Sequence, residues 1–200
     1  MKSKLLILTF LIVAQQGFSQ IGTGTLFVGG GFGISSSETT NRSTISLQPA
    51  VHYFISDNIS FGGIFGFSSS RNNPGADIYT RNTNFSITPA VRYYAELGEK
   101  VFLYGEGSLG IGFGSSTGIN GNNRADISSN GTFSLGLSPG IFYAPTEKIG
   151  FDLKFSLISY NRFSFTDETN DPTTTNVAND ISFAFSSFTP TFGVYYIIGN

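Results

Sequence analysis

The nine residues Ser46–Phe54, with the sequence SLQPAVHYF, recur three more times along this chain of 200 residues. The copies are Ser46–Phe54 (SLQPAVHYF), Ser86–Tyr94 (SITPAVRYY), Gly136–Ala144 (GLSPGIFYA) and Ser187–Tyr195 (SFTPTFGVY). Their prolines are 40, 50 and 51 residues apart. This spacing is too long for one strand per copy and suits one hairpin with its loops. Four copies of a two-strand unit predict eight strands in a single domain.

The segments around these copies alternate between apolar residues and small or polar ones, the period of two that is typical of β-strands. In 101–113, one predicted face carries Val101, Leu103, Leu109, Ile111 and Phe113, and the other carries Phe102, Tyr104, Glu106, Ser108, Gly110 and Gly112. The alternation changes phase near Ser186-Ser187, for which a β-bulge is the simplest cause. The repeat prolines lack an N–H donor, so we expect bulges or register adjustments there too.

The predicted connections alternate between short and long. The short ones are Ser56–Asn58, Leu97–Lys100 and Pro145–Lys148, and the long polar ones are Ser36–Arg42, Ser70–Asn82, Ser115–Gly131 and Asn161–Asp180. Short turns at one end and long loops at the other are typical of transmembrane β-barrels, with the turns on the periplasmic side and the loops outside the cell.

The composition excludes several classes of protein. Only 12% of the residues are charged, against about 25% in an ordinary soluble domain. The absence of cysteine excludes a disulfide scaffold and a cysteine-based zinc or redox site. The net charge of −2 argues against a generic nucleic-acid binder. The aromatic content of 15% disfavours disorder.

The N-terminus is predicted to be a cleaved secretory signal, Met1–Ser19. Lys2 and Lys4 precede the apolar run Leu5–Ala14, and Gly17 and Ser19 fit the small-residue cleavage pattern. A membrane-spanning helix is the alternative, but ten apolar residues are too short for one. The mature domain is then 20–200, and the protein leaves the cytoplasm.

The charged residues decide which predicted face meets lipid. A soluble sandwich or a lipocalin-like barrel also alternates, but with its apolar face inward. We expect only Arg92, Glu106, Asp152 and Lys154 to fall within strands, all on the small or polar face. Four charges could not solubilise a water-facing surface. Two acids and two bases cancel, as is required of charges in a narrow lumen. The apolar face is therefore predicted to meet lipid.

Two groups of side chains follow from this assignment. Tyr53, Tyr93 and Tyr143 each lie four residues after a repeat proline, and are predicted to form a periplasmic-side aromatic girdle on the lipid face. His52, Arg92, Glu106, Asp152 and Lys154 are predicted to form a polar cluster inside the barrel, with an Arg92–Glu106 ion pair. The cluster either plugs a narrow lumen or lines a proton or ion path, and an eight-stranded lumen filled by side chains favours the plug.

No catalytic, cofactor or metal site is predicted. His52 is the only histidine, and no serine partner for it is visible at a lipid-facing or extracellular position. Asp167, Glu168, Asp171 and Asp180 do not have the spacing of an EF-hand, so a solvated acidic segment is expected.

The stretch Pro49–Gly62, PAVHYFISDNISFG, resembles the recurring P-x-x-x-Y-F…D-N…G hairpin of the bacterial outer-membrane β-barrel domain family. Leu103–Gly107 is similar to the glycine-rich strands of these barrels, which include OmpX and the OmpA transmembrane domain. The resemblance implies an all-β, eight-stranded, antiparallel up-and-down transmembrane barrel in the cell outer membrane. The family includes adhesion, integrity and passive-channel members and a few enzymes. Such barrels usually end in an aromatic residue, whereas this chain ends in Gly199-Asn200.

The function expected from these observations is structural or interactive rather than enzymatic. The barrel would contact outer-membrane lipid or lipopolysaccharide and the outer-membrane assembly machinery, and would present its loops to a surface protein or glycan. A low-conductance porin is the alternative, and a lipid-modifying enzyme comes third.

Overall fold

A computed structural model describes residues 21–37, 39, 41–73, 77–169, 174–183 and 191–199. The described residues form ten β-strands and no helix, so none of them belongs to a helix that could cross a membrane. The strands are β1 Leu26–Ser37, β2 Arg42–Ser56, β3 Ile59–Asn72, β4 Ile78–Gly98, β5 Val101–Asn120, β6 Asn123–Tyr143, β7 Ile149–Lys154, β8 Ile158–Asp167, β9 Thr174–Phe183 and β10 Thr191–Ile198. The predicted export signal, Met1–Ser19, lies outside the described residues.

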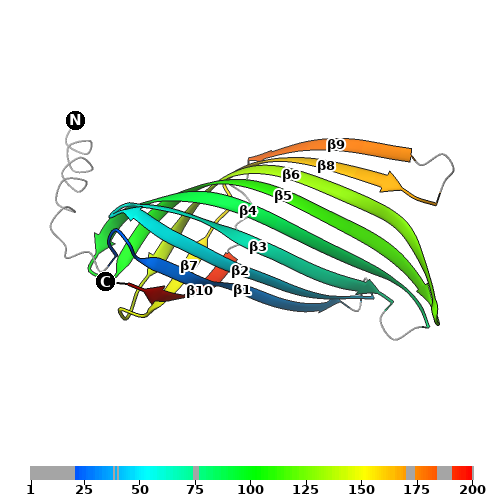
Figure 1. The fold of residues 1–200 in the computed structure, drawn as a ribbon, viewed down its shortest axis with the longest axis horizontal. Coiled ribbons are helices and arrows are strands. Elements are labelled where there is room, and N and C mark those ends of the chain that lie inside the picture. The colour runs from blue at the N-terminus through cyan, green and yellow to red at the C-terminus, as the bar shows by residue number, and fades with distance from the viewer. Residues whose placement is uncertain are drawn as a thin grey trace.

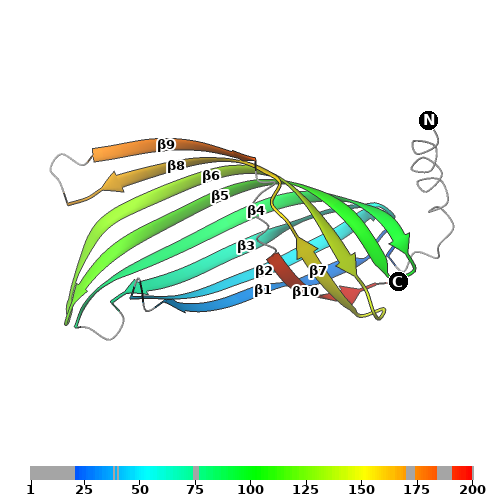
Figure 2. The same ribbon diagram turned by 180° about the vertical axis from the view of Figure 1, so that it is seen from behind.

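All ten strands belong to one antiparallel sheet, which confirms the predicted all-β antiparallel class. Strands β1 to β6 pair in sequence order, β6 pairs with β7, β7 with β10, and β10 with β1. These pairings close a ring of eight strands around one end of the molecule (Figures 1 and 2). Strand β8 pairs with the remaining length of β6, and β9 pairs with β8.

The strand count differs from the predicted eight because the last two predicted strands are each described in two pieces. β7 and β8 both lie against β6 but are separated by residues 155–157. The register changes there by one residue, since Gly140 pairs with Lys154 whereas Leu137 pairs with Ile158. β9 and β10 are separated by 184–190. The bulge predicted near Ser186-Ser187 lies outside the described residues.

The prolines behave differently from one another. The β2–β3 register is the same on both sides of Pro49, and so is the β4–β5 register around Pro89, so a register adjustment at these two prolines was a wrong prediction. Pro139 lies between Leu137 and Gly140 of β6, where the register with β7 and β8 changes by one residue. Its carbonyl accepts a hydrogen bond from the Phe155 amide (2.9 Å), but it has no N–H with which to return one.

The long polar loops were also predicted wrongly, because most of their residues are paired strand. Ser115–Gly131 contains the last residues of β5 and the first residues of β6, which are joined by the two-residue turn Gly121-Asn122. Ser70–Asn82 and Asn161–Asp180 likewise contain the ends of strands. Serine, threonine and asparagine interrupt the apolar alternation, but the backbone ladder needs no apolar side chains to continue. More charges therefore lie within strands than the four predicted, among them Arg71 and Arg81.

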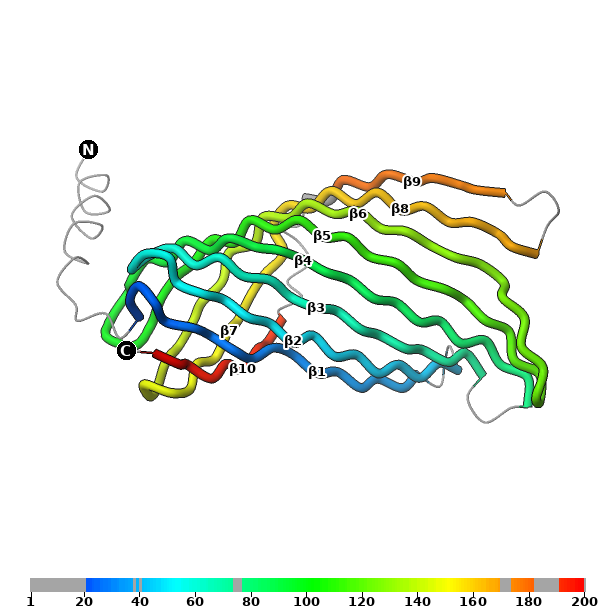
Figure 3. Tube along the Cα trace, in the orientation of Figure 1, coloured from blue at the N-terminus to red at the C-terminus, as the bar shows by residue number. Residues whose placement is uncertain are grey.

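Among the described residues, the ring is open along one seam at the long-strand end. β1 pairs with both β2 and β10 over Leu26–Gly30, but within this described part of the chain its remaining residues, Gly31–Ser37, pair only with β2. Within the described chain, β9 pairs only with β8. Figure 3 shows β1 and β9 on opposite borders of the spread sheet. We call this gap between Gly31–Ser37 and β9 the open seam.

Candidate functional site

Strand alternation places the predicted polar residues on the inner face of the closed ring. Arg92 in β4 is directly paired with Glu106 in β5, so both side chains point to the same face. Asp152 and Lys154 come from β7, the strand beyond β6. His52 in β2 is paired with Gly62. All five residues lie at the short-turn end, where the ring is complete.

Four of these residues form one ion-pair network. Arg92 Nε lies 2.7 Å from Glu106 Oε2, and Arg92 Nη2 lies 3.1 Å from Asp152 Oδ2. The second oxygen of Glu106 lies 2.9 Å from Lys154 Nζ. The Arg92 and Glu106 side chains are each 1% exposed, whereas Lys154 is 18% exposed. The two cations and two anions cancel, so the network carries no net charge into the interior.

Aromatic rings pack around this network, a feature absent from the sequence predictions. The Arg92 guanidinium lies over the Tyr104 ring, 4.5 Å from its centroid, and the Tyr104 hydroxyl donates a hydrogen bond to Asp152. In the same interior, the Phe27 ring stacks on the Phe142 ring, with the two centroids 4.7 Å apart. The complete interior ring cluster is Phe27, Phe54, Tyr94, Phe102, Tyr104, Phe142 and Tyr195, all buried. The ion-pair network and this cluster are both buried inside the closed ring.

Two glycines make room for these rings. A Cβ atom at Gly140 would collide with the Tyr104 ring, and one at Gly150 would collide with the Phe142 ring. Gly140 in β6 is paired with Tyr104 of the neighbouring strand β5, and Gly150 lies in β7, the neighbour of the β6 strand that carries Phe142. Each ring therefore packs against the backbone of the strand next to it.

The sequence does contain a signal for the ring cluster. Adjacent aromatic residues occur at Tyr53-Phe54, Tyr93-Tyr94, Phe142-Tyr143 and Tyr195-Tyr196. Neighbouring residues of a strand point to opposite faces, so one ring of each pair has to lie inside. The outward members include the predicted girdle, Tyr53, Tyr93 and Tyr143, which are 48%, 59% and 44% exposed. Tyr196 is exposed on the same face.

His52 is fully buried beside the ring cluster, with its ring centroid 6.2 Å from that of Tyr195. Neither ring nitrogen has a hydrogen-bond partner among the described residues. A histidine acting as a general base needs a nucleophile within hydrogen-bond reach, and the described part of the chain places none beside His52. The described residues also contain no group of three or more histidine, cysteine, aspartate or glutamate side chains that could hold a metal ion.

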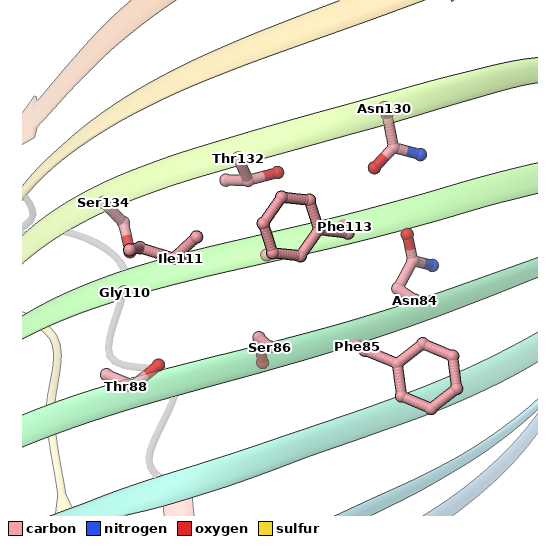
Figure 4. Close-up of a pocket in the computed structure, with 11 residues that line it drawn as sticks. Asn84, Phe85, Ser86, Thr88, Gly110, Ile111, Phe113, Asn130, Thr132 and Ser134 are labelled. Atoms are coloured by element: carbon pink, nitrogen blue, oxygen red, sulfur yellow. The ribbon is translucent and has the colours of Figure 1, made fainter.

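A polar cavity of about 310 Å³ lies on the inner face beyond the network, toward the long-strand end (Figure 4). Its polar side chains come from β4 and β6: Asn84, Ser86, Thr88, Asn130, Thr132 and Ser134. Between these two strands, β5 contributes Gly110 and Gly112, which have no side chain to fill the space. None of the lining residues is charged, and Phe85, Ile111 and Phe113 contribute apolar surface beside the amides and hydroxyls.

The outer face carries an apolar band that is bounded by rings at both levels. Phe67, Phe85 and Phe113 occupy successive cross-strand positions on β3, β4 and β5. They border the band on the side of the long-strand end, and the exposed tyrosines border it on the side of the short turns. The Phe67 and Phe85 centroids are 5.1 Å apart. Beyond this row the outer face turns polar, with Ser69, Thr83 and the arginines of β3 and β4.

The comparison with curated proteins gave no match to this sequence. A family model, described as the outer membrane protein beta-barrel domain, matches residues 5–194. This match covers nearly the whole chain, including every strand from β1 to β9 and part of β10. The family is consistent with the all-antiparallel sheet, and it points to an outer-membrane location. The chain belongs to the outer membrane protein β-barrel family.

Proposed function

We propose that this protein is a small transmembrane β-barrel of the outer membrane, whose eight-stranded ring is a sealed anchor with a structural or surface-interaction role. The observation that carries the proposal is the interior of the ring. Arg92 is fully buried between two carboxylates and several rings. A lumen filled in this way holds the barrel together without providing a pathway for ions.

The outward apolar band supports the membrane assignment. On β4 it runs from Phe85 to Leu97, with Ile87, Val91 and Tyr93 also exposed on that face. A strand segment of this length spans about 40 Å at ~3.3 Å per residue. At a tilt of ~45° it crosses about 28 Å, which fits the apolar band of about 25 Å in outer-membrane barrels. Closure satisfies the backbone where the ring is complete, at Leu26–Gly30 of β1, and this part of the ring can sit in lipid.

The two ends of the ring take different roles in this proposal. The short turns face the periplasm, and the upper parts of β3 to β6 extend beyond the bilayer toward the cell surface. The Met1–Ser19 segment directs export, and the assembly machinery inserts the chain. The partners at the surface are a protein or glycan that contacts the strand tips, and the proposal assigns the chain no catalytic step.

Single-channel recording of the refolded mature chain in a planar bilayer tests the sealed interior. Heat-dependent mobility in gels is the control for folding. We expect a folded protein that produces no discrete conductance steps, because the ion-pair network and the rings occupy the lumen.

The alternative, a low-conductance channel through the interior charges, predicts the opposite. Discrete steps whose size changes in Arg92→Ala or Glu106→Ala would make the network a pathway and contradict the sealed anchor. A lipid-modifying enzyme predicts lipid turnover that His52→Ala abolishes, so measuring turnover with both proteins separates this third possibility.

A further inference from the structure

Two arginines lie directly opposite each other on the outer face of the sheet. Arg71 in β3 and Arg81 in β4 are cross-strand partners, in a register that is continuous from Ile59 to Asn72. They lie on the same face as Phe67 and Phe85. Each arginine is four residues from the phenylalanine of its own strand, on the side of the long-strand end. Arg71 is exposed and Arg81 is half-buried. Like charges in directly opposed positions destabilise a sheet, so this pair calls for a compensating partner.

Among the described residues, neither arginine forms an ion pair with a carboxylate. All three ion pairs among the described residues lie in the interior network. What the arginines share is the ring of Tyr79, whose centroid lies 5.4 Å from Arg71 Cζ and 5.9 Å from Arg81 Cζ. Arg81 Nη2 also donates to the Tyr79 hydroxyl at 3.4 Å. The ring keeps the guanidinium groups near each other without neutralising them.

The cross-strand rows below the arginines change character in a fixed order. Phe67 pairs with Phe85, Ser69 with Thr83, and Arg71 with Arg81. The outer face thus passes from apolar rings, through hydroxyls, to two cations within four residues of each strand. A lipid at the surface of a bilayer passes through the same order, from acyl chain through ester and glycerol to phosphate.

We propose that this ladder, formed by these six residues, binds the phosphate group of a lipid in the leaflet nearest the strand tips. The guanidinium forks of Arg71 and Arg81 hold the phosphate oxygens, a geometry to which arginine is well suited. The hydroxyls of Ser69 and Thr83 face the glycerol region, and an acyl chain lies along Phe67 and Phe85. This inference rests on the membrane assignment proposed above, because only a bilayer at the apolar band brings lipid phosphate to this level.

The test measures binding of dioctanoyl phosphatidic acid, by calorimetry, to the refolded chain in micelles of a neutral maltoside detergent. The variant Arg71→Gln/Arg81→Gln removes the pair. The matched control, Arg42→Gln/Arg124→Gln, removes the same charge from the same end of the molecule. Arg42 lies on the inner face, with Nη2 3.0 Å from Ser70 Oγ, and Arg124 lies close to the Gly121-Asn122 turn.

We expect the Arg71/Arg81 variant to bind at least about tenfold more weakly than the wild type, and the control to stay within about twofold. Equal binding by the wild type and the Arg71/Arg81 variant would overturn the proposal. Inorganic phosphate that binds as tightly as phosphatidic acid would also overturn it, because the site would then recognise a free anion. A wild-type chain without the heat-dependent gel shift would instead contradict the membrane-spanning fold on which the proposal rests.

Discussion

Arg92 makes more polar contacts than any other charged side chain in the described interior. It is an ion-pair partner of both Glu106 and Asp152. Removing its side chain would leave the Glu106 and Asp152 carboxylates buried, with Lys154 as the only remaining cation. Breaking a buried ion pair from one side is far more harmful than replacing both members together. The double substitution should therefore lower the free energy of unfolding by less than the sum of the two single substitutions.

We expect Arg92→Ala to lower the free energy of unfolding by about 3–5 kcal/mol. The double variant Arg92→Ala/Glu106→Ala should lose less than the sum of the single losses, with a coupling energy of about 0.5–3 kcal/mol. Urea unfolding of the chain in lipid vesicles measures both. The exposed Arg124→Ala variant is the control and should change stability by less than about 0.5 kcal/mol. Strict additivity would mean that the Arg92–Glu106 contact contributes nothing of its own.

The interior charges could be placed from sequence because side-chain direction in a strand needs only a count of residues. Parity across the Leu97–Lys100 turn puts Arg92 opposite Tyr104 or Glu106, and in the structure Arg92 is paired with Glu106. The contact of Tyr104 with Asp152 spans 48 residues and could not be read in the same way. It depends on β5 and β7 both flanking β6, and on how far Tyr104 reaches across Gly140.

The strands are where the sequence predictions succeeded and failed most visibly. The alternation identified each strand as far as its apolar residues continue, up to about Phe67 on β3, Phe85 on β4 and Phe113 on β5. Beyond those rings the strands continue, although their side chains are mostly serine, threonine and asparagine. Composition therefore marked the end of the apolar band and was mistaken for the end of the strand.

The cost of a charge on the outer face of β5 should depend on its level. Leu109 lies within the apolar band and Ser115 lies just past Phe113, and both are exposed on the same face. We expect Leu109→Arg to cost about 2–4 kcal/mol in vesicles, and Ser115→Arg about 0–1 kcal/mol. Urea unfolding of the two variants compares them directly. Equal losses would show that the two positions do not differ in depth.

The described residues form one complete end and one open end, and β1 belongs to both. Leu26–Gly30 is paired on both sides, whereas Gly31–Ser36 has β2 on one side and the open seam on the other. In an antiparallel strand successive N–H groups point to opposite sides. Every second amide of Gly31–Ser36 therefore points into the seam.

Amide hydrogen exchange in detergent micelles should resolve this difference. We expect all amides of Leu26–Gly30 to be protected, and alternate amides of Phe32–Ser36 to exchange quickly. The corresponding residues of β2, which are paired with β3 as well as with β1, are the internal control. Slow exchange at every amide up to Ser36 would mean that another strand covers this edge.

The paired strands beyond the apolar band also have a mechanical consequence. On β4 and β5 about seven residues continue past the phenylalanine row, which corresponds to about 23 Å of strand. A tethered loop of that length would collapse and fluctuate, but neighbouring strands joined by backbone hydrogen bonds resist bending. The tip at Gly121-Asn122 is therefore a stiff spacer, and whatever touches it is held at a fixed distance from the bilayer.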